Sequence, residues 1–128
     1  MDRMRIGDLT ERAGVTQRTV RYYESIGLLS SGEREGKGHH YYTEETIARL
    51  QKIDQLKKIG LSLEEIRDVI DLYFTDTSGV APKRKVLDIL RRHLTETDRK
   101  IEALGQFRSD LQSNIERFEQ WLEANERD

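Results

Sequence analysis

The most regular hydrophobic pattern lies in the last third of the chain, between residues 83 and 124. Apolar side chains recur there in alternating steps of three and four residues, the spacing of helices that pack along a common seam. The pattern predicts one helix of about 40 residues, which would be about 60 Å long at roughly 1.5 Å per residue. Nine of the eleven seam positions are apolar: Leu87, Leu90, Leu94, Ile101, Leu104, Leu111, Ile115, Phe118 and Leu122.

A seam of this length needs a second surface to cover it. The helix could pack on the preceding part of its own chain, or fold back on itself at Gly105. However, a head built from roughly the first 80 residues cannot cover about 60 Å of helix. We therefore expect the nine seam residues to form a dimer interface with a second copy of the chain.

The beginning of the chain shows much shorter elements. Residues 6–12 and 17–25 each have the spacing of a short helix, with Ile6 and Leu9 on one face of the first. Gly14 supplies a left-handed turn between them, and Thr16 is placed to cap the second helix. Two short helices joined by a tight glycine turn form a helix-turn-helix.

A different pattern follows between residues 27 and 42. This stretch contains four glycines and ends in the β-prone pair Tyr41-Tyr42. We predict a short β-hairpin whose tip is the charged run from Glu33 to Gly38.

Two further helices are predicted before the long one. Thr43 is placed to cap the first, whose buried face runs through Ile47, Leu50, Ile53 and Leu56 and which ends at Gly60. Ser62 and Glu65 have the spacing of a capping box at the start of the second, which continues to Tyr73. The predicted organisation is a mainly α head with a small β-hairpin over residues 1–75, a linker over 76–82, the long helix over 83–124 and a tail over 125–128. Pro82, at the end of the linker, suits the first turn of the long helix.

Composition narrows the possible functions. The chain has no cysteine, which excludes disulfides and thiolate metal sites, and no run of about 20 apolar residues that could span a membrane. The N-terminus carries no signal-peptide pattern, so we expect a cytoplasmic protein. The formal net charge is -2, and residues 1–42 hold seven Lys and Arg against six Asp and Glu. Charge therefore neither requires nor excludes a nucleic-acid partner, because only a local basic surface is needed.

The second short helix carries chemistry suited to DNA. Gln17, Arg18 and Arg21 lie away from the apolar Val20, and Tyr22 can flank the same face. Arginine and glutamine hydrogen-bond base edges in the major groove, while threonine and tyrosine hydroxyls hydrogen-bond phosphates. The alternative is a solvated polar helix face, with Tyr22 and its neighbouring tyrosine in the core.

The head contains the motifs Arg5-Ile6-Gly7-Asp8-Leu9, Gly14-Val15, Thr19-Val20-Arg21-Tyr22-Tyr23-Glu24 and Gly27-Leu28-Leu29. Tyr42-Thr43-Glu44-Glu45 and the segment Gly60 to Ile66 follow, before the long terminal helix. Together these segments resemble the MerR family of bacterial transcriptional regulators over essentially the whole chain.

The resemblance implies a winged helix-turn-helix head, with residues 17–25 as recognition helix and the hairpin 27–42 as wing. It also implies an antiparallel coiled-coil homodimer that binds a palindromic operator and distorts promoter DNA, which acts on RNA polymerase indirectly. No cofactor is implied. The residues expected at the DNA are Thr16, Gln17, Arg18, Thr19, Arg21, Tyr22, Lys37, His40 and Tyr42.

The chain departs from the family pattern at His40, which stands where an arginine often contacts phosphate. A neutral imidazole can donate one hydrogen bond but brings no fixed charge, so we expect a weaker, pH-dependent contact. His39 and His40 could instead bind a metal. Adjacent residues of a strand point to opposite faces, however, which disfavours chelation of one ion.

The effector is the least determined feature. Metal and redox sensors of this family use cysteines near the dimer helix, and this chain has none. We also expect no large ligand-binding domain after the coiled coil. A small organic ligand or no ligand remains, and Phe107, Phe118 and Trp121 could line a pocket or only pack. Arg108, in the seam, could extend its head group to solvent or pair with an acid of the partner helix.

An architectural protein and an enzyme are the two alternatives to a regulator. An architectural protein that bends DNA without regulated output would share the same head and dimer. An enzyme is not expected, because the sequence shows no nucleophile with a base, no phosphate-binding glycine loop and no carboxylate pair beyond exposed Glu-Glu doublets.

Overall fold

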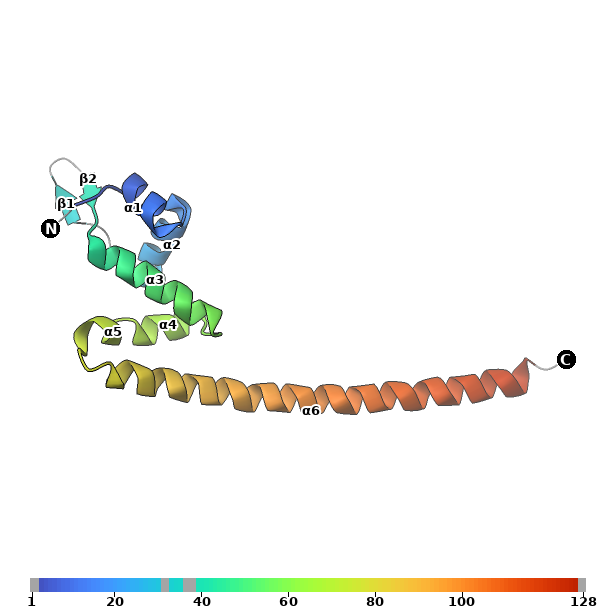
Figure 1. The fold of residues 1–128 in the computed structure, drawn as a ribbon. Coiled ribbons are helices and arrows are strands. Elements are labelled where there is room, and N and C mark those ends of the chain that lie inside the picture. Colours follow the sequence, from blue (N-terminus) through green and yellow to red (C-terminus); the bar gives the residue numbers. More distant parts are fainter. Residues whose placement is uncertain (1–2, 31–32, 36–38, 127–128) are drawn as a thin grey trace. The chain divides into compact units, whose positions relative to one another are not determined.

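The computed structural model describes residues 3–30, 33–35 and 39–126. Its contacts divide the chain into two units, Met1–Leu90 and Arg91–Asp128. The first unit contains five short helices and a hairpin, and the long helix α6 contributes to both units (Figure 1). The fold is therefore mainly α with a small β-hairpin, as the sequence predicts.

The first two helices form the predicted helix-turn-helix. They are α1 (Ile6–Ala13) and α2 (Gln17–Ser25). Gly14 connects them with a φ of 71°, the left-handed conformation expected at a helix C-cap. Thr16 caps α2, since its hydroxyl oxygen accepts the backbone N–H of Thr19 at 3.0 Å.

The hairpin consists of β1 (Glu33–Glu35) and β2 (His39–Tyr41), paired antiparallel with Arg34 opposite His40. The predicted tip began at Glu33, whereas the structure places Glu33–Glu35 in the first strand. The strand pairing therefore extends into the charged run. Two backbone hydrogen bonds between Met4 and Tyr42, at 2.9 and 2.7 Å, pair the N-terminal segment with the residue that follows β2.

Three helices follow the hairpin: α3 (Glu44–Lys58), α4 (Leu63–Val69) and α5 (Leu72–Thr75). The predicted capping box at the start of α4 is confirmed, with Ser62 and Glu65 each accepting the other's backbone N–H. Two details of the prediction were wrong. Thr43 precedes α3 but makes no side-chain capping bond, and the helix predicted through Tyr73 ends at Val69, before a separate turn of helix.

The core of the first unit gathers side chains from α1, α2, α3 and α4 and from the segments that connect them. Leu9, Val20, Ile53 and Ile66 are almost completely buried, and the salt bridge Arg12–Glu44 at 2.7 Å joins α1 to α3 across the surface. This packing fixes α2 against α1 and α3 by its Val20 side. The opposite side of α2 is left exposed.

Helix α6 (Val80–Asn125) begins three residues before the predicted start at Lys83. Its first turns belong to the first unit, because Val86 and Ile89 are buried in the core and Leu90 packs partly against it. The predicted linker 76–82 is thus partly helical. No hairpin forms at Gly105, since α6 runs through it without a break.

The remaining seam of α6 is exposed in the single chain. Leu94, Ile101 and Leu104 are 62%, 62% and 65% accessible, and Phe118 is 67% accessible. Within the described part of the chain, no helix is both long and apolar enough to cross a lipid bilayer. The apolar surface of α6 is therefore a stripe on one side of a polar helix.

Asp76 holds the start of α6. Its carboxylate accepts the Ser78 hydroxyl at 2.7 Å, the Ser78 N–H at 3.0 Å and the Ala81 N–H at 2.8 Å. The Ser78 hydroxyl, followed by the Ala81 N–H, lowers the pKa of Asp76. The earlier start of the helix follows from this side chain, which satisfies an N–H of the first turn.

Asp76→Ala is expected to lower the melting temperature by a few degrees at pH 7, because it leaves N–H groups of the first turn without an acceptor. A lowered folded-state pKa adds stability above the unfolded value of about 3.9 and loses it as pH falls through the folded value. The difference between wild type and variant should therefore narrow below about pH 4. Thermal unfolding followed by circular dichroism measures it.

Asp54→Ala is the matched control for this measurement. Asp54→Ala also removes a carboxylate contact, the ion pair with Lys58 at 2.9 Å, but both of these side chains are largely exposed. Such a pair contributes little. Equal melting temperatures for Asp76→Ala and Asp54→Ala at pH 7 would contradict the capping role.

Candidate nucleic-acid interface

The exposed side of α2 presents a compact set of polar side chains. Gln17, Arg18, Arg21 and Tyr22 all lie at the surface, and Tyr22 is 52% accessible. Its neighbour Tyr23 is 7% accessible and belongs to the core. The two tyrosines therefore have different environments, and only Tyr22 shares the surface with the arginines.

Arg18 and Arg21 are available for an external partner. Within residues 3–30, 33–35 and 39–126, neither guanidinium makes a hydrogen bond or an ion pair. Each carries donors that match phosphate oxygens and the acceptor edge of guanine. Two such groups one helical turn apart form a positively charged strip that a nucleic acid could neutralise.

Thr16 and Thr19 have a local role in this surface. The Thr16 hydroxyl oxygen accepts the Thr19 N–H, and the Thr16 hydroxyl donates to the Thr19 side-chain oxygen, both at 3.0 Å. These bonds set the direction in which α2 begins. Contact of either threonine with DNA remains a prediction.

Tyr42 connects the hairpin to α2 from inside. It is 5% accessible, and its hydroxyl donates to a carboxylate oxygen of Glu24 at 3.2 Å. Burial and then the nearby Glu24 carboxylate raise the pKa of the Tyr42 hydroxyl. This position supports a role in holding α2, and DNA contact by Tyr42 stays a prediction.

The hairpin residues expected at the DNA are only partly described. His40 lies in β2 opposite Arg34 and is partly buried. Lys37, which the resemblance also places at the DNA, lies outside the described residues. Contact of either residue with DNA remains untested.

Arg67 is a surface residue that the sequence did not single out. Its guanidinium donates to the backbone carbonyl of Ile26 at 3.2 Å, just after α2 ends. Arg67 and Tyr22 also line one shallow surface pocket. No local signal could have revealed this, because the contact joins residues 41 positions apart.

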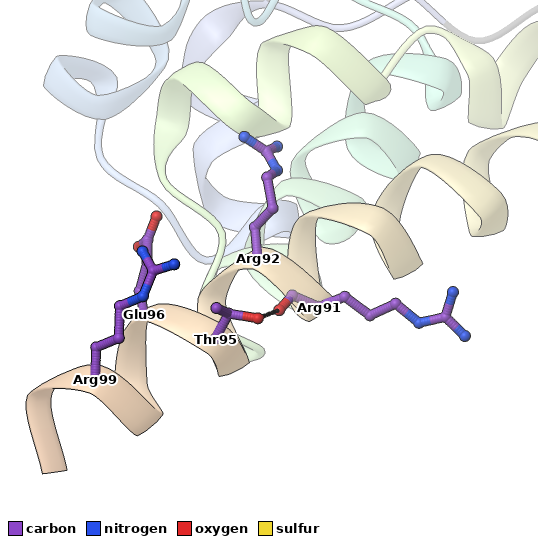
Figure 2. A pocket seen from close by; sticks show the side chains of 5 residues that line it. All are labelled: Arg91, Arg92, Thr95, Glu96 and Arg99. Carbon is purple, nitrogen blue, oxygen red and sulfur yellow. Dashed lines mark hydrogen bonds between the residues drawn. The ribbon is translucent and has the colours of Figure 1, made fainter. Parts of the chain in front are cut away.

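Two surface pockets lie on α6 within the second unit. One, of about 520 Å³, is lined by Arg117, Phe118, Trp121 and Leu122. Figure 2 shows the other, where Arg91, Arg92 and Arg99 surround Thr95 and Glu96 and the Thr95 hydroxyl donates to the Arg91 carbonyl. Phe107 lines neither of them. Among the residues described, no group of three His, Asp or Glu is arranged to hold a metal ion.

Two family models match this chain. The model described as MerR HTH family regulatory protein covers residues 4–72. The model described as MerR, DNA binding covers residues 47–113. Together they extend from the helix-turn-helix into α6.

Individual relatives agree with the family models. The transcriptional regulator HmrR of Rhizobium leguminosarum bv. viciae is 38% identical over 85% of this chain and 81% of its own length. The nodulation protein NolA of a Bradyrhizobium strain is 36% identical over 87% of this chain, which spans only 43% of NolA. The crystal structure of the transcription regulator PbrR691 of Ralstonia metallidurans, a complex with lead(II), matches with a TM-score of 0.71 at 29% identity over 86% of each chain.

Tyr42→Phe and Tyr22→Phe should separate structural from binding roles, because each removes only a hydroxyl. Loss of the buried bond to Glu24 should lower the free energy of unfolding by about 1 kcal/mol for Tyr42→Phe. Tyr22→Phe, at an exposed site, should leave stability unchanged and weaken binding to double-stranded DNA. Urea unfolding and fluorescence anisotropy measure the two effects, and a larger stability loss for Tyr22→Phe would reverse the assignment.

Proposed function

The chain belongs to the MerR family of regulatory proteins, which are DNA-binding transcription regulators and not enzymes, and we propose that it binds a palindromic operator as a homodimer. The exposed face of α2, on which Arg18 and Arg21 make no hydrogen bond or ion pair with the described residues, is the observation that carries this proposal. A two-fold dimer presents two such faces, which read two half-sites whose spacing the dimer sets. Action on DNA would place the protein in the cytoplasm.

The dimer would form along the exposed seam of α6. Fully burying one leucine or isoleucine contributes about 1.5–3 kcal/mol, so a few seam residues from each subunit supply several kcal/mol. Leu94, Ile101, Leu104, Leu111 and Ile115 are between 45% and 65% accessible in the single chain. The antiparallel arrangement implied by the family would bury them together.

Control of the promoter would act through the shape of the DNA. A dimer that bends or untwists its operator changes how RNA polymerase meets the two promoter elements. No surface of the protein then has to bind the polymerase. Whether the outcome is activation or repression depends on the position of the operator.

We propose a small organic molecule as the effector, if one is used. The absence of cysteine disfavours a thiolate-bound metal, although the related PbrR691 was crystallised with lead(II). The apolar pocket beside Trp121 is the candidate position on the described chain. Its Phe118 and Leu122 walls belong to the seam, so a bound ligand would also contact the partner subunit. Titration of tryptophan fluorescence is a direct test, since Trp121 is the chain's one tryptophan.

An architectural protein that only bends DNA is the alternative. Footprinting on the promoter of its own gene separates the two functions. A regulator should protect one palindrome, whereas an architectural protein should give broad protection with little sequence preference.

Arg18→Ala/Arg21→Ala should weaken binding to the palindrome by at least one hundredfold, because each arginine contributes about 1–3 kcal/mol. If one arginine binds phosphate, the dependence of log Kd on log salt should also become shallower. Anisotropy titrations at several salt concentrations measure both quantities.

The control is Arg91→Ala/Arg92→Ala, which removes the same charge from exposed residues outside the head. It should change affinity far less. Unchanged palindrome affinity in Arg18→Ala/Arg21→Ala would refute the assignment of α2 as the recognition helix.

His40→Arg should tighten operator binding near pH 8, where a histidine ordinarily carries no charge and arginine supplies a permanent one. Affinities of both proteins at pH 8 test it, and equal values would argue against a phosphate contact at this position.

A further inference from the structure

The seam of α6 contains two polar residues, Thr97 and Arg108, among nine apolar ones. The Thr97 hydroxyl donates to the His93 carbonyl at 2.7 Å, so its donor is used while its oxygen can still accept. Arg108 carries only donors, and its guanidinium makes no hydrogen bond or ion pair within the part of the chain that the structure describes. These two side chains limit how two copies of the helix can be aligned.

A parallel alignment in register is unfavourable. It would place each seam residue against its own copy, and Arg108 would face Arg108 of the partner subunit. Two like charges would then meet in a largely apolar interface, where the repulsion is stronger than in water. An antiparallel pair avoids this, because each seam position faces a different one.

In an antiparallel pair, Arg108 inserts beside one seam residue of the partner and the residue that follows it. Successive alignments differ by one heptad, so only a few combinations are possible. The pairs that Arg108 could meet are Leu90-Arg91, Thr97-Asp98, Leu104-Gly105, Leu111-Gln112 and Phe118-Glu119 of the partner subunit. Three of them offer no acidic side chain. The last offers Glu119, but that alignment overlaps only the end of the helix and leaves Leu87, Leu90 and Leu94 uncovered.

We propose that two copies of α6 pair antiparallel in the single register that places Arg108 against Thr97 and Asp98 of the partner subunit. This inference rests on the proposed homodimer and adds its register. Only this alignment gives the guanidinium both a carboxylate and a hydroxyl acceptor, and it also matches the two polar positions with each other. The other pairs within the seam are apolar: Leu87 with Phe118, Leu90 with Ile115, Leu94 with Leu111, and Ile101 with Leu104 of the partner subunit. Leu122 faces Lys83 of the partner subunit, just outside the seam.

The same register gives Phe107 a neighbour. Phe107 is 58% accessible and lies beside the seam, where Lys100 of the partner subunit would approach it. Packing of a lysine stem on an aromatic ring favours a structural role for Phe107 over a pocket. The opposite side of α6, which carries Arg92, Thr95, Glu96 and Arg99 in Figure 2, stays in water.

The absence of cysteine allows a direct test with engineered disulfides. Leu94→Cys/Leu111→Cys should give a covalent dimer after mild oxidation with oxidised glutathione, since the proposed register brings these two positions together. Within one helix they are about 25 Å apart, so no internal disulfide can form. Non-reducing electrophoresis of the full chain measures the product.

Two comparisons make the result decisive. Leu94→Cys/Phe118→Cys reports the register shifted by one heptad, and Leu94→Cys alone reports the parallel alignment. Both should remain non-covalent. A covalent dimer from either one, or none from Leu94→Cys/Leu111→Cys, would overturn the proposed register. If the register is overturned but the protein still sediments as a dimer and still binds the palindrome, the proposed function itself stands.

Arg108→Leu tests whether the arginine selects the register. Added to the two cysteine pairs, it should let the Leu94→Cys/Phe118→Cys pair form a covalent dimer as well. Arg99→Leu, on the opposite side of α6, is the matched control. In this variant only the Leu94→Cys/Leu111→Cys pair should form a covalent dimer, as without the added substitution. If Arg108→Leu gives the same pattern as Arg99→Leu, Arg108 does not determine the alignment.

Discussion

Exposure of apolar surface to water is unfavourable, and α6 carries an exposed apolar stripe along most of its length. Leu94, Ile101 and Leu104 are more than 60% accessible although the spacing of the seam is regular. At about 25 cal/mol for each Å² of apolar surface removed from water, covering this stripe yields enough free energy to hold two subunits together. Every proposal about the two-fold symmetry of DNA binding depends on that association.

The long helix also connects association with recognition. Its first turns belong to the core of the head through Val86 and Ile89, while its remaining turns carry the seam. Arg67 and Tyr42 in turn hold the C-terminal end of α2, through Ile26 and Glu24. A shift in the pairing of α6 would therefore reach the recognition helix through packed and hydrogen-bonded side chains, without any change in the residues that face DNA.

Local signals in the sequence were sufficient for some of these elements and insufficient for others. Gly14, Thr16 and the Ser62/Glu65 box act within four residues, so α1, α2 and the start of α4 could be predicted closely. The start of α6 was placed late because the Asp76 carboxylate reaches five residues ahead to Ala81, outside the usual capping pattern. The burial of Tyr42 and the contact of Arg67 with Ile26 depend on tertiary packing, which periodicity does not encode.

Polar residues in the seam lower the stability of the coiled coil, and their value lies in excluding other alignments. A fully apolar seam would pair almost equally well after a shift of one heptad. Such a shift would change the separation of the two heads by about 10 Å, whereas the half-sites of a palindrome are about 34 Å apart on one face of the duplex. The dimer could then no longer place both α2 helices in successive grooves. In the proposed register, a single arginine would thus contribute to operator recognition by fixing the distance between two surfaces that it does not contact.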